Sequence, residues 1–416
     1  MGSASRFSRV SNMQQAELLN TKVTDHACDD DANFTLVLGG PLYQLYLRTK
    51  LARPALELVT RRAASIALIC WIPLLILTLF DGYALGGVKL PFLLDLGVYT
   101  RFLAALPLMI AAEWIVYHRL NSIVQQFVDR GIVRTEDRPR FNELIASAKR
   151  LQSSSIAEAI LFVAAITIGH WAWWQNVISV VPTWFASGIG PDQRLTLAGY
   201  WYAFVSLPIL RFILLRWYFR VFVWYRFLWG VRTLPLHFNL FHPDRAGGLG
   251  FLAGSVSAFA PVLVAQTILL SGIIGDRILH AGATLPTFKM EIVGVVAFLM
   301  LLVLTPLTFF LFRLEEAGRK AKREYGLLAS RYVEDFHYKW IRGQRPEGEP
   351  LLGTSDIQSL ADLGNAYNVV SDIRLVPISK RVVLRLAVIL IVPILPLTLT
   401  MVPLDKIVDR VIKLVF

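Results

Sequence analysis

The sequence is poor in charge and in cysteine. Charged residues make up only 17% of its 416 residues, whereas soluble proteins contain about 25%. The two cysteines, Cys28 and Cys70, lie in an acidic tail and in an apolar run, so neither a disulfide nor a metal-binding spacing is expected. The first residues also lack the apolar core of a cleaved signal peptide. These absences argue against a soluble domain and against a disulfide scaffold.

What the chain has instead is long apolar segments. Hydrophobic residues make up 55% of it, and its mean hydropathy is +0.53. About 20 apolar residues suffice to span a bilayer as a helix, and the sequence contains seven such runs, at residues 63–80, 98–117, 156–181, 199–217, 250–274, 292–312 and 382–402. The sequence therefore predicts an all-α fold, a polytopic transmembrane helical bundle of about seven spans with cytoplasmic amphipathic helices.

The net charge of +12 does not indicate nucleic-acid binding, because no soluble basic domain is present and lysines and arginines lie beside the spans. Lysines and arginines gather in every second loop between the spans. The loops on the opposite side hold only four, Lys89, Arg194, Arg277 and Lys289. Cytoplasmic loops carry the excess of positive charge, so we expect the N-terminus in the cytoplasm.

The runs divide the chain into four parts. Residues 1–62 form a cytoplasmic tail and an interfacial segment, with 34–46 expected on the membrane surface. Residues 63–318 form a six-span membrane domain with a cytoplasmic insert at 120–155. Residues 319–380 form a cytoplasmic helical segment, and 381–416 form the seventh span and an amphipathic C-terminal helix. We expect both cytoplasmic segments to pack on the membrane domain, because neither is large enough to have a core of its own.

A series of arginines continues from the fourth span: Arg211, Arg216, Arg220, Arg226 and Arg232. Their uneven spacing excludes the every-third-residue stripe of a voltage sensor. Arg211 lies deepest and needs a partner, and Glu113 and Glu158 are expected at a matching depth. The sequence predicts that Arg211 pairs with one of them. These acids, with Arg211 and Arg216, either lock helix packing or line a polar vestibule that admits ions.

The loop at 237–250 is the densest polar motif. Pro243 ends the preceding segment, Asp244 is suited to capping a turn, and Gly247 and Gly248 permit unusual backbone angles. A glycine-rich helix start beside Arg245 also suits an anion. A metal site is the weaker alternative, with His237, His242 and Asp244 as candidate ligands and His118 or Glu113 completing the set.

Two stretches resemble a family of bacterial multi-pass inner-membrane proteins to which no activity has been assigned. They are Phe-His-Pro-Asp-Arg-Ala-Gly-Gly-Leu-Gly-Phe-Leu at 241–252, and Leu-Gly-Thr-Ser-Asp-Ile-Gln-Ser-Leu-Ala-Asp-Leu-Gly-Asn at 352–365 with Ile-Arg-Leu-Val-Pro at 373–377. The resemblance implies a bacterial inner membrane and no particular activity.

The leading functional hypothesis is a channel or transporter for ions or small charged solutes, working as a homo-oligomer in the lipid bilayer. At least one proline falls inside every span except the third, which favours kinked helices around a cavity. The alternatives are a membrane-anchored sensor or scaffold that acts through 319–380 and a metal-dependent membrane enzyme. No cofactor is expected, and no nucleophile, phosphate-loop or zinc-protease motif is present.

Overall fold

The computed structural model describes residues 34–401 except 38, 50–57, 178–182, 188–193, 345–347, 349 and 351–353, and for 170–177 it describes the backbone alone. The amphipathic helix predicted near the C-terminus, within 402–416, lies outside the described residues.

Most of the described chain is helical and strands are nearly absent from it, which confirms the all-α fold class. The α-helices are α2 (Pro41–Arg48), α3 (Val59–Phe80), α4 (Leu96–Val98), α5 (Leu106–Asp129), α6 (Arg138–Gln152), α7 (Ser155–Val177), α8 (Leu197–Trp201), α9 (Leu207–Val231), α10 (Ala253–Ala281), α11 (Lys289–Leu304), α12 (Leu311–Phe336), α13 (Asp356–Ser371) and α14 (Lys380–Ile391).

Short segments of tighter or wider helix connect or extend these elements. The 3₁₀ segments are η2 (Phe92–Leu94), η4 (Thr135–Asp137), η7 (Leu249–Leu252), η8 (Leu285–Phe288), η9 (Thr305–Phe310) and η11 (Val392–Met401). The π-helical segments are η3 (Tyr99–Ala105), η6 (Tyr202–Ser206) and η10 (His337–Ile341). The strands β1 (Ala186–Ser187) and β2 (Arg194–Leu195) pair antiparallel.

The described part of every predicted apolar run is helical. Among the described residues six helices meet the length and apolarity of a span, and α6 and α7, which are bent by 42° against each other, add a seventh where the pair is counted as one span. The six are Val59–Phe80, Leu96–Asp129, Leu197–Val231, Leu249–Ala281, Leu285–Ile341 and Lys380–Met401. The protein is therefore a multi-pass helical membrane protein.

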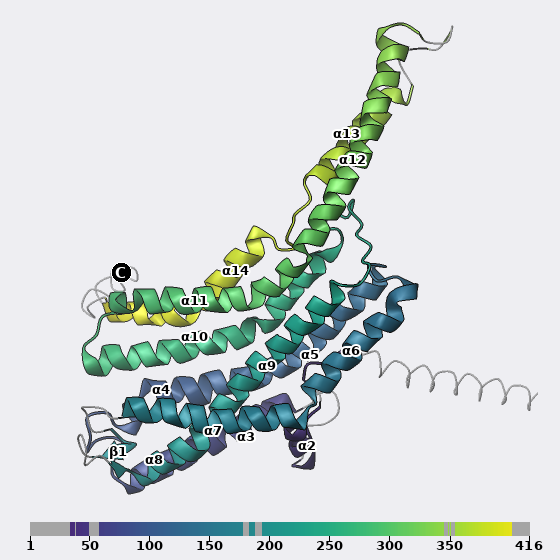
Figure 1. The fold of residues 1–416 in the computed structure, drawn as a ribbon. Helices are drawn as coiled ribbons and strands as arrows, with labels where there is room; N and C mark the ends of the chain where they lie inside the picture. Colours follow the sequence, from purple (N-terminus) through teal and green to yellow (C-terminus); the bar gives the residue numbers. More distant parts are fainter. Residues whose placement is uncertain are drawn as a thin grey trace, which may run out of the picture.

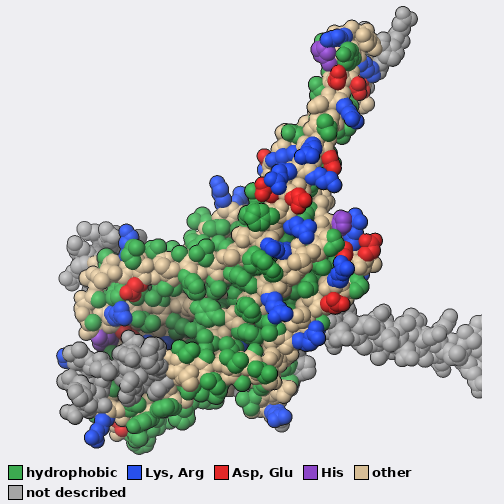
Figure 2. Space-filling model, viewed as in Figure 1, with side chains coloured by type: hydrophobic (Ala, Val, Ile, Leu, Met, Phe, Trp, Pro, Cys, Tyr) green, Lys and Arg blue, Asp and Glu red, His purple; other side chains and the backbone are tan. Residues whose placement is uncertain are grey.

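The long helices lie side by side in one bundle (Figure 1). Helix α5 is central, since it packs against α3 on one side and α10 on another, while α9 packs against α6 and α7. Figure 2 shows a broad area of hydrophobic side chains on the face of the bundle in view, and many lysines and arginines towards the end from which α12 leaves. Large apolar side chains such as Phe80, Ile156 and Leu301 are exposed, as expected where lipid takes the place of water.

Helices α12 and α13 form a long arm that stands away from the bundle (Figure 1). At its base Arg374 N–H donates to the carbonyl of Arg245 at 2.6 Å, and at its far end Lys339 pairs with Asp356 at 2.8 Å. The expectation that 319–380 packs on the membrane domain is therefore wrong beyond the base of the arm, because α12 simply continues the sixth span. The insert at 120–155 does pack on the bundle, through Phe141 and Ile145 of α6.

The prediction that residues 34–46 lie on the membrane surface is wrong for the first of these residues. Phe34, Leu36 and Val37 are at most 2% exposed, so they lie in the protein core and not on the membrane surface. The Phe34 ring lies 4.6 Å from the ring of Phe227, and its N–H donates to Asn121 Oδ1 at 3.1 Å. A short apolar segment can bury its side chains either at the lipid interface or between helices, and in this structure Phe34 packs between helices.

Candidate functional site

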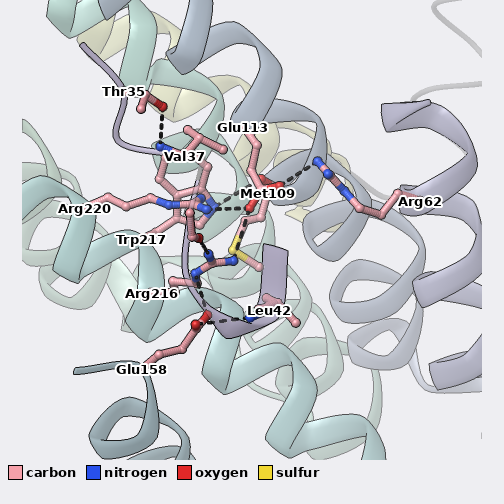
Figure 3. Close-up of polar contacts among 11 residues, drawn as sticks. Thr35, Val37, Leu42, Arg62, Met109, Glu113, Glu158, Arg216, Trp217 and Arg220 are labelled. Carbon is pink, nitrogen blue, oxygen red and sulfur yellow. Dashed lines mark hydrogen bonds and ion pairs between the residues drawn. The ribbon is translucent and has the colours of Figure 1, made fainter. Parts of the chain in front are cut away.

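A buried group of charges lies where α3, α5, α7 and α9 meet (Figure 3). It comprises Arg62, Glu113, Glu158, Arg216 and Arg220, and we call it the Glu113 cluster. Arg62 Nη2 donates to one oxygen of Glu113 at 2.6 Å, and Arg220 Nη2 donates to the other at 2.7 Å. Both arginines and Glu113 are at most 6% exposed. One carboxylate thus fastens three helices of the membrane domain together.

Arg216 joins the two carboxylates of the cluster. Its Nη1 lies 3.9 Å from Glu113, and its Nε lies 3.3 Å from Glu158. The contact with Glu158 is an ion pair without hydrogen-bond geometry, since that oxygen has no hydrogen-bond partner. The other oxygen of Glu158 accepts the N–H of Leu42 at 3.2 Å. The segment that contains Leu42 therefore contacts the cluster in addition to the four helices.

Local sequence explains how α9 supplies two of these charges. Arg216 and Arg220 are four residues apart and so share one face of the helix. Trp217 holds them in place, because its Nε1 donates to the Met109 carbonyl at 3.1 Å and its ring lies 4.5 Å from the Arg220 guanidinium carbon. From the sequence, Arg220 was predicted only as one of the arginine series and not as part of the vestibule, and Arg62 was not predicted as a site residue.

Arg211 is not part of this cluster, and the prediction that it pairs with Glu113 or Glu158 is wrong. Five residues separate it from Arg216, which turns it about 140° around the helix axis to another face. It lies instead against Gly169 of α7, where a Cβ would be 2.6 Å from Arg211 Cδ. Its Nη1 is buried and has no hydrogen-bond partner in the described part of the chain.

A second group of charges lies at the opposite end of the bundle. It comprises Asp95, Arg101, Tyr202 and Asp276, and we call it the Asp276 cluster. The carboxylate of Asp276 accepts the N–H groups of Leu96 and Gly97 at 2.8 and 2.9 Å. Arg101 Nη1 donates to Tyr202 Oη at 2.8 Å. A Cβ at Gly97 would be 3.1 Å or less from Asp95, Arg101 and Asp276, so these three side chains converge there.

The Asp276 cluster sits between two matching irregularities in the helices. The π segments η3 and η6 both end just before a Leu-Pro pair, with Pro107 and Pro208 in the next helices. A proline has no N–H to donate to the preceding turn, and π segments are frequent at functional sites. Arg101 and Tyr202 each precede their proline by six residues and contact each other. This correspondence was not predicted, although a comparison of the two Leu-Pro pairs in the sequence, at 106–107 and 207–208, could have revealed it.

The His-Pro-Asp loop is a turn built around one carboxylate. Asp244 accepts three backbone N–H groups, from Ala246, Gly248 and Gly250 at 2.8, 3.2 and 2.7 Å. Partial burial by itself would raise the pKa of Asp244. The three N–H donors outweigh it, with a smaller contribution from His242, and hold the pKa below its usual value. The sequence predicted that N–H groups at this helix start could bind an external anion, but in the structure they already donate to Asp244.

The loop residues considered as metal ligands do not converge. His242 Nδ1 lies 3.1 Å from Asp244 Oδ1, but the described residues contain no group of three His, Cys, Asp or Glu side chains able to hold a metal. His237 adds only its N–H, donated to the Ile132 carbonyl at 2.9 Å. Arg245 pairs with Asp372 at 3.1 Å and so ties the loop to the arm. Gly247 and Gly248 have φ values of 64° and 92°, as a tight turn requires.

A cavity of about 690 Å³ reaches one member of the Glu113 cluster. It lies between α2, α3, α7 and α9, and its walls are mostly apolar, with Glu158, Tyr46 and Thr49 among its few polar side chains. Burial raises the pKa of Tyr46 to about 12, with Glu113 adding to the shift, so this phenol stays neutral. The other four charges of the cluster do not line the cavity, so the buried pairs are closed to it.

No protein-family profile, curated protein or solved structure matches this chain. The function of the protein is therefore inferred from the two charge clusters and from Arg211.

Proposed function

We propose that this protein transports a small anion across the membrane, with Arg211 as the binding residue midway along the path. The position of Arg211 on the helix is the observation that carries the proposal. Tyr202, Arg211 and Arg220 are spaced nine residues apart, which is about 14 Å each way along a helix. The two clusters thus lie about 27 Å apart along this helix, close to the thickness of the hydrocarbon core of about 30 Å.

Arg211 differs from the arginines at either end because no carboxylate pairs with it in the described part of the chain. Cations inside a membrane are costly and are retained where they pair or serve a solute. The Glu113 cluster itself holds three arginines and two carboxylates, so with every group ionised it carries a net charge of +1. The surplus charge at one end and the Arg211 guanidinium, which has no carboxylate partner among the described residues, both favour an anion over a cation.

A flux assay in liposomes that contain the purified protein tests this proposal. The probes are chloride, nitrate and inorganic phosphate, with potassium as the cation control. We expect at least one anion to pass faster than in protein-free liposomes. Arg211→Gln should lower that flux about tenfold, since it removes a charged hydrogen-bond donor, and Arg211→Lys should retain part of it. Arg226→Gln is the matched control, because Arg226 lies exposed on the same helix.

Three results would overturn the proposal: no anion flux from protein that melts cooperatively, potassium flux without anion flux, or an equal loss in Arg226→Gln. The first would favour the second candidate, a membrane-anchored scaffold. That candidate is supported by the arm, on which Leu327 and Leu328 of α12 are both more than half exposed. A scaffold requires no flux.

We further propose that the arm and the His-Pro-Asp loop face the cytoplasm of a bacterial cell, as the distribution of lysine and arginine favours. The test uses Arg140→Cys and Lys289→Cys, one at a time, in a chain that carries Cys28→Ser and Cys70→Ala. Both positions are exposed, at opposite ends of the bundle. In intact cells an impermeant maleimide should label only position 289. Labelling of position 140 without permeabilisation would reverse the orientation. The homo-oligomer stays a prediction, which the mass of the purified protein in detergent tests.

A further inference from the structure

An open polar groove runs beside α5 near the start of α10. Its volume is about 570 Å³, and no carboxylate lines it among the described residues. Its polar side chains are those of His118, Arg119, Ser122, Gln126, Arg130 and Ser257. Two arginines and a histidine therefore share one concave surface with hydroxyl and amide groups, and nothing in its walls neutralises them.

The basic groups differ in how firmly they are held. Arg130 is fixed at one wall, since its Nη1 donates to the Gly248 carbonyl at 3.1 Å and its guanidinium lies 5.1 Å from the ring of Phe251. The Nδ1 of His118 lies 3.0 Å from the Trp114 carbonyl and donates to it, which leaves Nε2 for a ligand. Arg119 forms no hydrogen bond or ion pair with the residues that the structure describes.

The groove lies at the edge of the lipid-facing band. Trp114 is 48% exposed, and its ring lies 4.5 Å from that of His118. Exposed tryptophans gather at the membrane–water interface. On α5, His118 and Arg119 follow Glu113 by five and six residues, which places them about 8–9 Å beyond the Glu113 cluster along the helix axis. We expect phospholipid headgroups at that depth, because the two charge clusters are separated by about the thickness of the hydrocarbon core.

We propose that this groove binds a phosphate group and that the phosphate belongs to the headgroup of an anionic phospholipid. Arginine and histidine side chains donate the charge-assisted hydrogen bonds that phosphate oxygens accept. The binding comes from these side chains and not from the helix start, because Asp244 already occupies the Gly248 and Gly250 N–H groups. The position of Trp114 selects the lipid over a free phosphate ion.

Thermal unfolding of the whole protein in detergent tests the proposal. The probes are short-chain phosphatidylglycerol, phosphatidylcholine of equal chain length and inorganic phosphate, and the readout is the melting temperature. A ligand that binds only the folded state raises it. We expect phosphatidylglycerol to raise it more than the other two probes. Arg119→Gln should weaken that binding about tenfold, since it removes one charged donor, and should leave the melting temperature without lipid unchanged.

Arg140→Gln is the control, because Arg140 is an exposed arginine on the same end of the bundle outside the groove. An equal loss of binding in Arg140→Gln would mean a general surface attraction and would overturn the site. Equal stabilisation by phosphatidylcholine, or an unaffected Arg119→Gln, would also overturn it. A shift with inorganic phosphate as large as with phosphatidylglycerol would overturn the assignment to lipid. Since no flux is measured, this test is independent of anion transport.

Discussion

Arg220 of α9 and Glu113 of α5 are 107 residues apart in the chain and joined by a hydrogen bond of 2.7 Å in the core of the membrane domain. Arg62 of α3 binds the other oxygen of the same carboxylate at 2.6 Å. Glu113 therefore balances the charge of three buried arginines, Arg62, Arg216 and Arg220. Its removal provides the most direct test of the Glu113 cluster.

Glu113→Gln should destabilise the fold strongly. Neutralising the carboxylate leaves the guanidinium groups of Arg62 and Arg220 buried without their main counter-charge, and breaking such a pair costs about 3–5 kcal/mol. Thermal unfolding in detergent measures the loss. Glu291→Gln is the control, since Glu291 is exposed and lies 4.0 Å from an exposed Arg277. Equal melting temperatures for Glu113→Gln and the wild type would mean that the cluster does not stabilise the bundle.

Arg216 and Glu158 should be coupled, whereas Arg211 and Glu158 should not. In a double-mutant cycle, Arg216→Gln and Glu158→Gln should show an interaction energy of about 0.5–3 kcal/mol, because the two side chains are in contact. Arg211→Gln with Glu158→Gln should give additive losses. Both cycles use melting in detergent. Coupling between Arg211 and Glu158, with additive losses for Arg216 and Glu158, would instead support the pairing that the sequence alone predicts.

Asp244→Asn should destabilise the loop in a pH-dependent way. An acid whose pKa is lower in the folded chain than in the unfolded chain stabilises the fold above the unfolded value, about 3.9. That contribution disappears as the pH falls through the folded pKa, which for Asp244 is lowered. The wild type should therefore melt above the variant at neutral pH, and the difference should shrink below about pH 4. A difference independent of pH would mean that the charge of Asp244 is unimportant.

Gly248→Val should lower yield and stability through the backbone. Gly248 has a φ of 92°, which a β-branched residue resists, and such strain costs about 1–3 kcal/mol. Its Cβ would meet nothing closer than 3.7 Å, so the effect would not come from a clash. Gly294→Val is the control, since Gly294 lies in a helix with open space around its Cβ and no positive φ. Equal yields of the two variants would contradict the turn geometry.

His242→Ala should leave folding nearly unchanged, because its ring is partly exposed and its polar contacts in the described part of the chain are with the neighbouring Asp244. Elemental analysis of the wild type and this variant separates a turn residue from a metal ligand. Stoichiometric zinc or iron that disappears in His242→Ala would overturn the account of the loop as a turn held by Asp244.

The positions of the helices follow from the sequence because they depend on short-range properties. A run of about 20 apolar residues must form a helix in lipid, since no other partner exists for its backbone groups. That reasoning located seven apolar runs, six of which lie in helices that meet the criteria for a span by themselves, and the turn at Gly247 and Gly248. It also identified Glu113, Glu158 and Arg216 as intramembrane charges, which the structure places together. Whether that cluster serves transport stays a proposal.

The sequence by itself determined which segments are helical and apolar enough to enter a membrane, because hydropathy and backbone satisfaction act within each segment. Only the tertiary structure decided which charges meet. The packing of α9 turns Arg216 and Arg220, and not Arg211, towards Glu113, and the packing of α3 brings Arg62 to the same carboxylate. The same packing lets Phe34 insert between helices and leaves the α12–α13 arm away from the bundle beyond its base. Depth along one helix can be counted from the sequence, but the direction that a side chain faces depends on its neighbours in space.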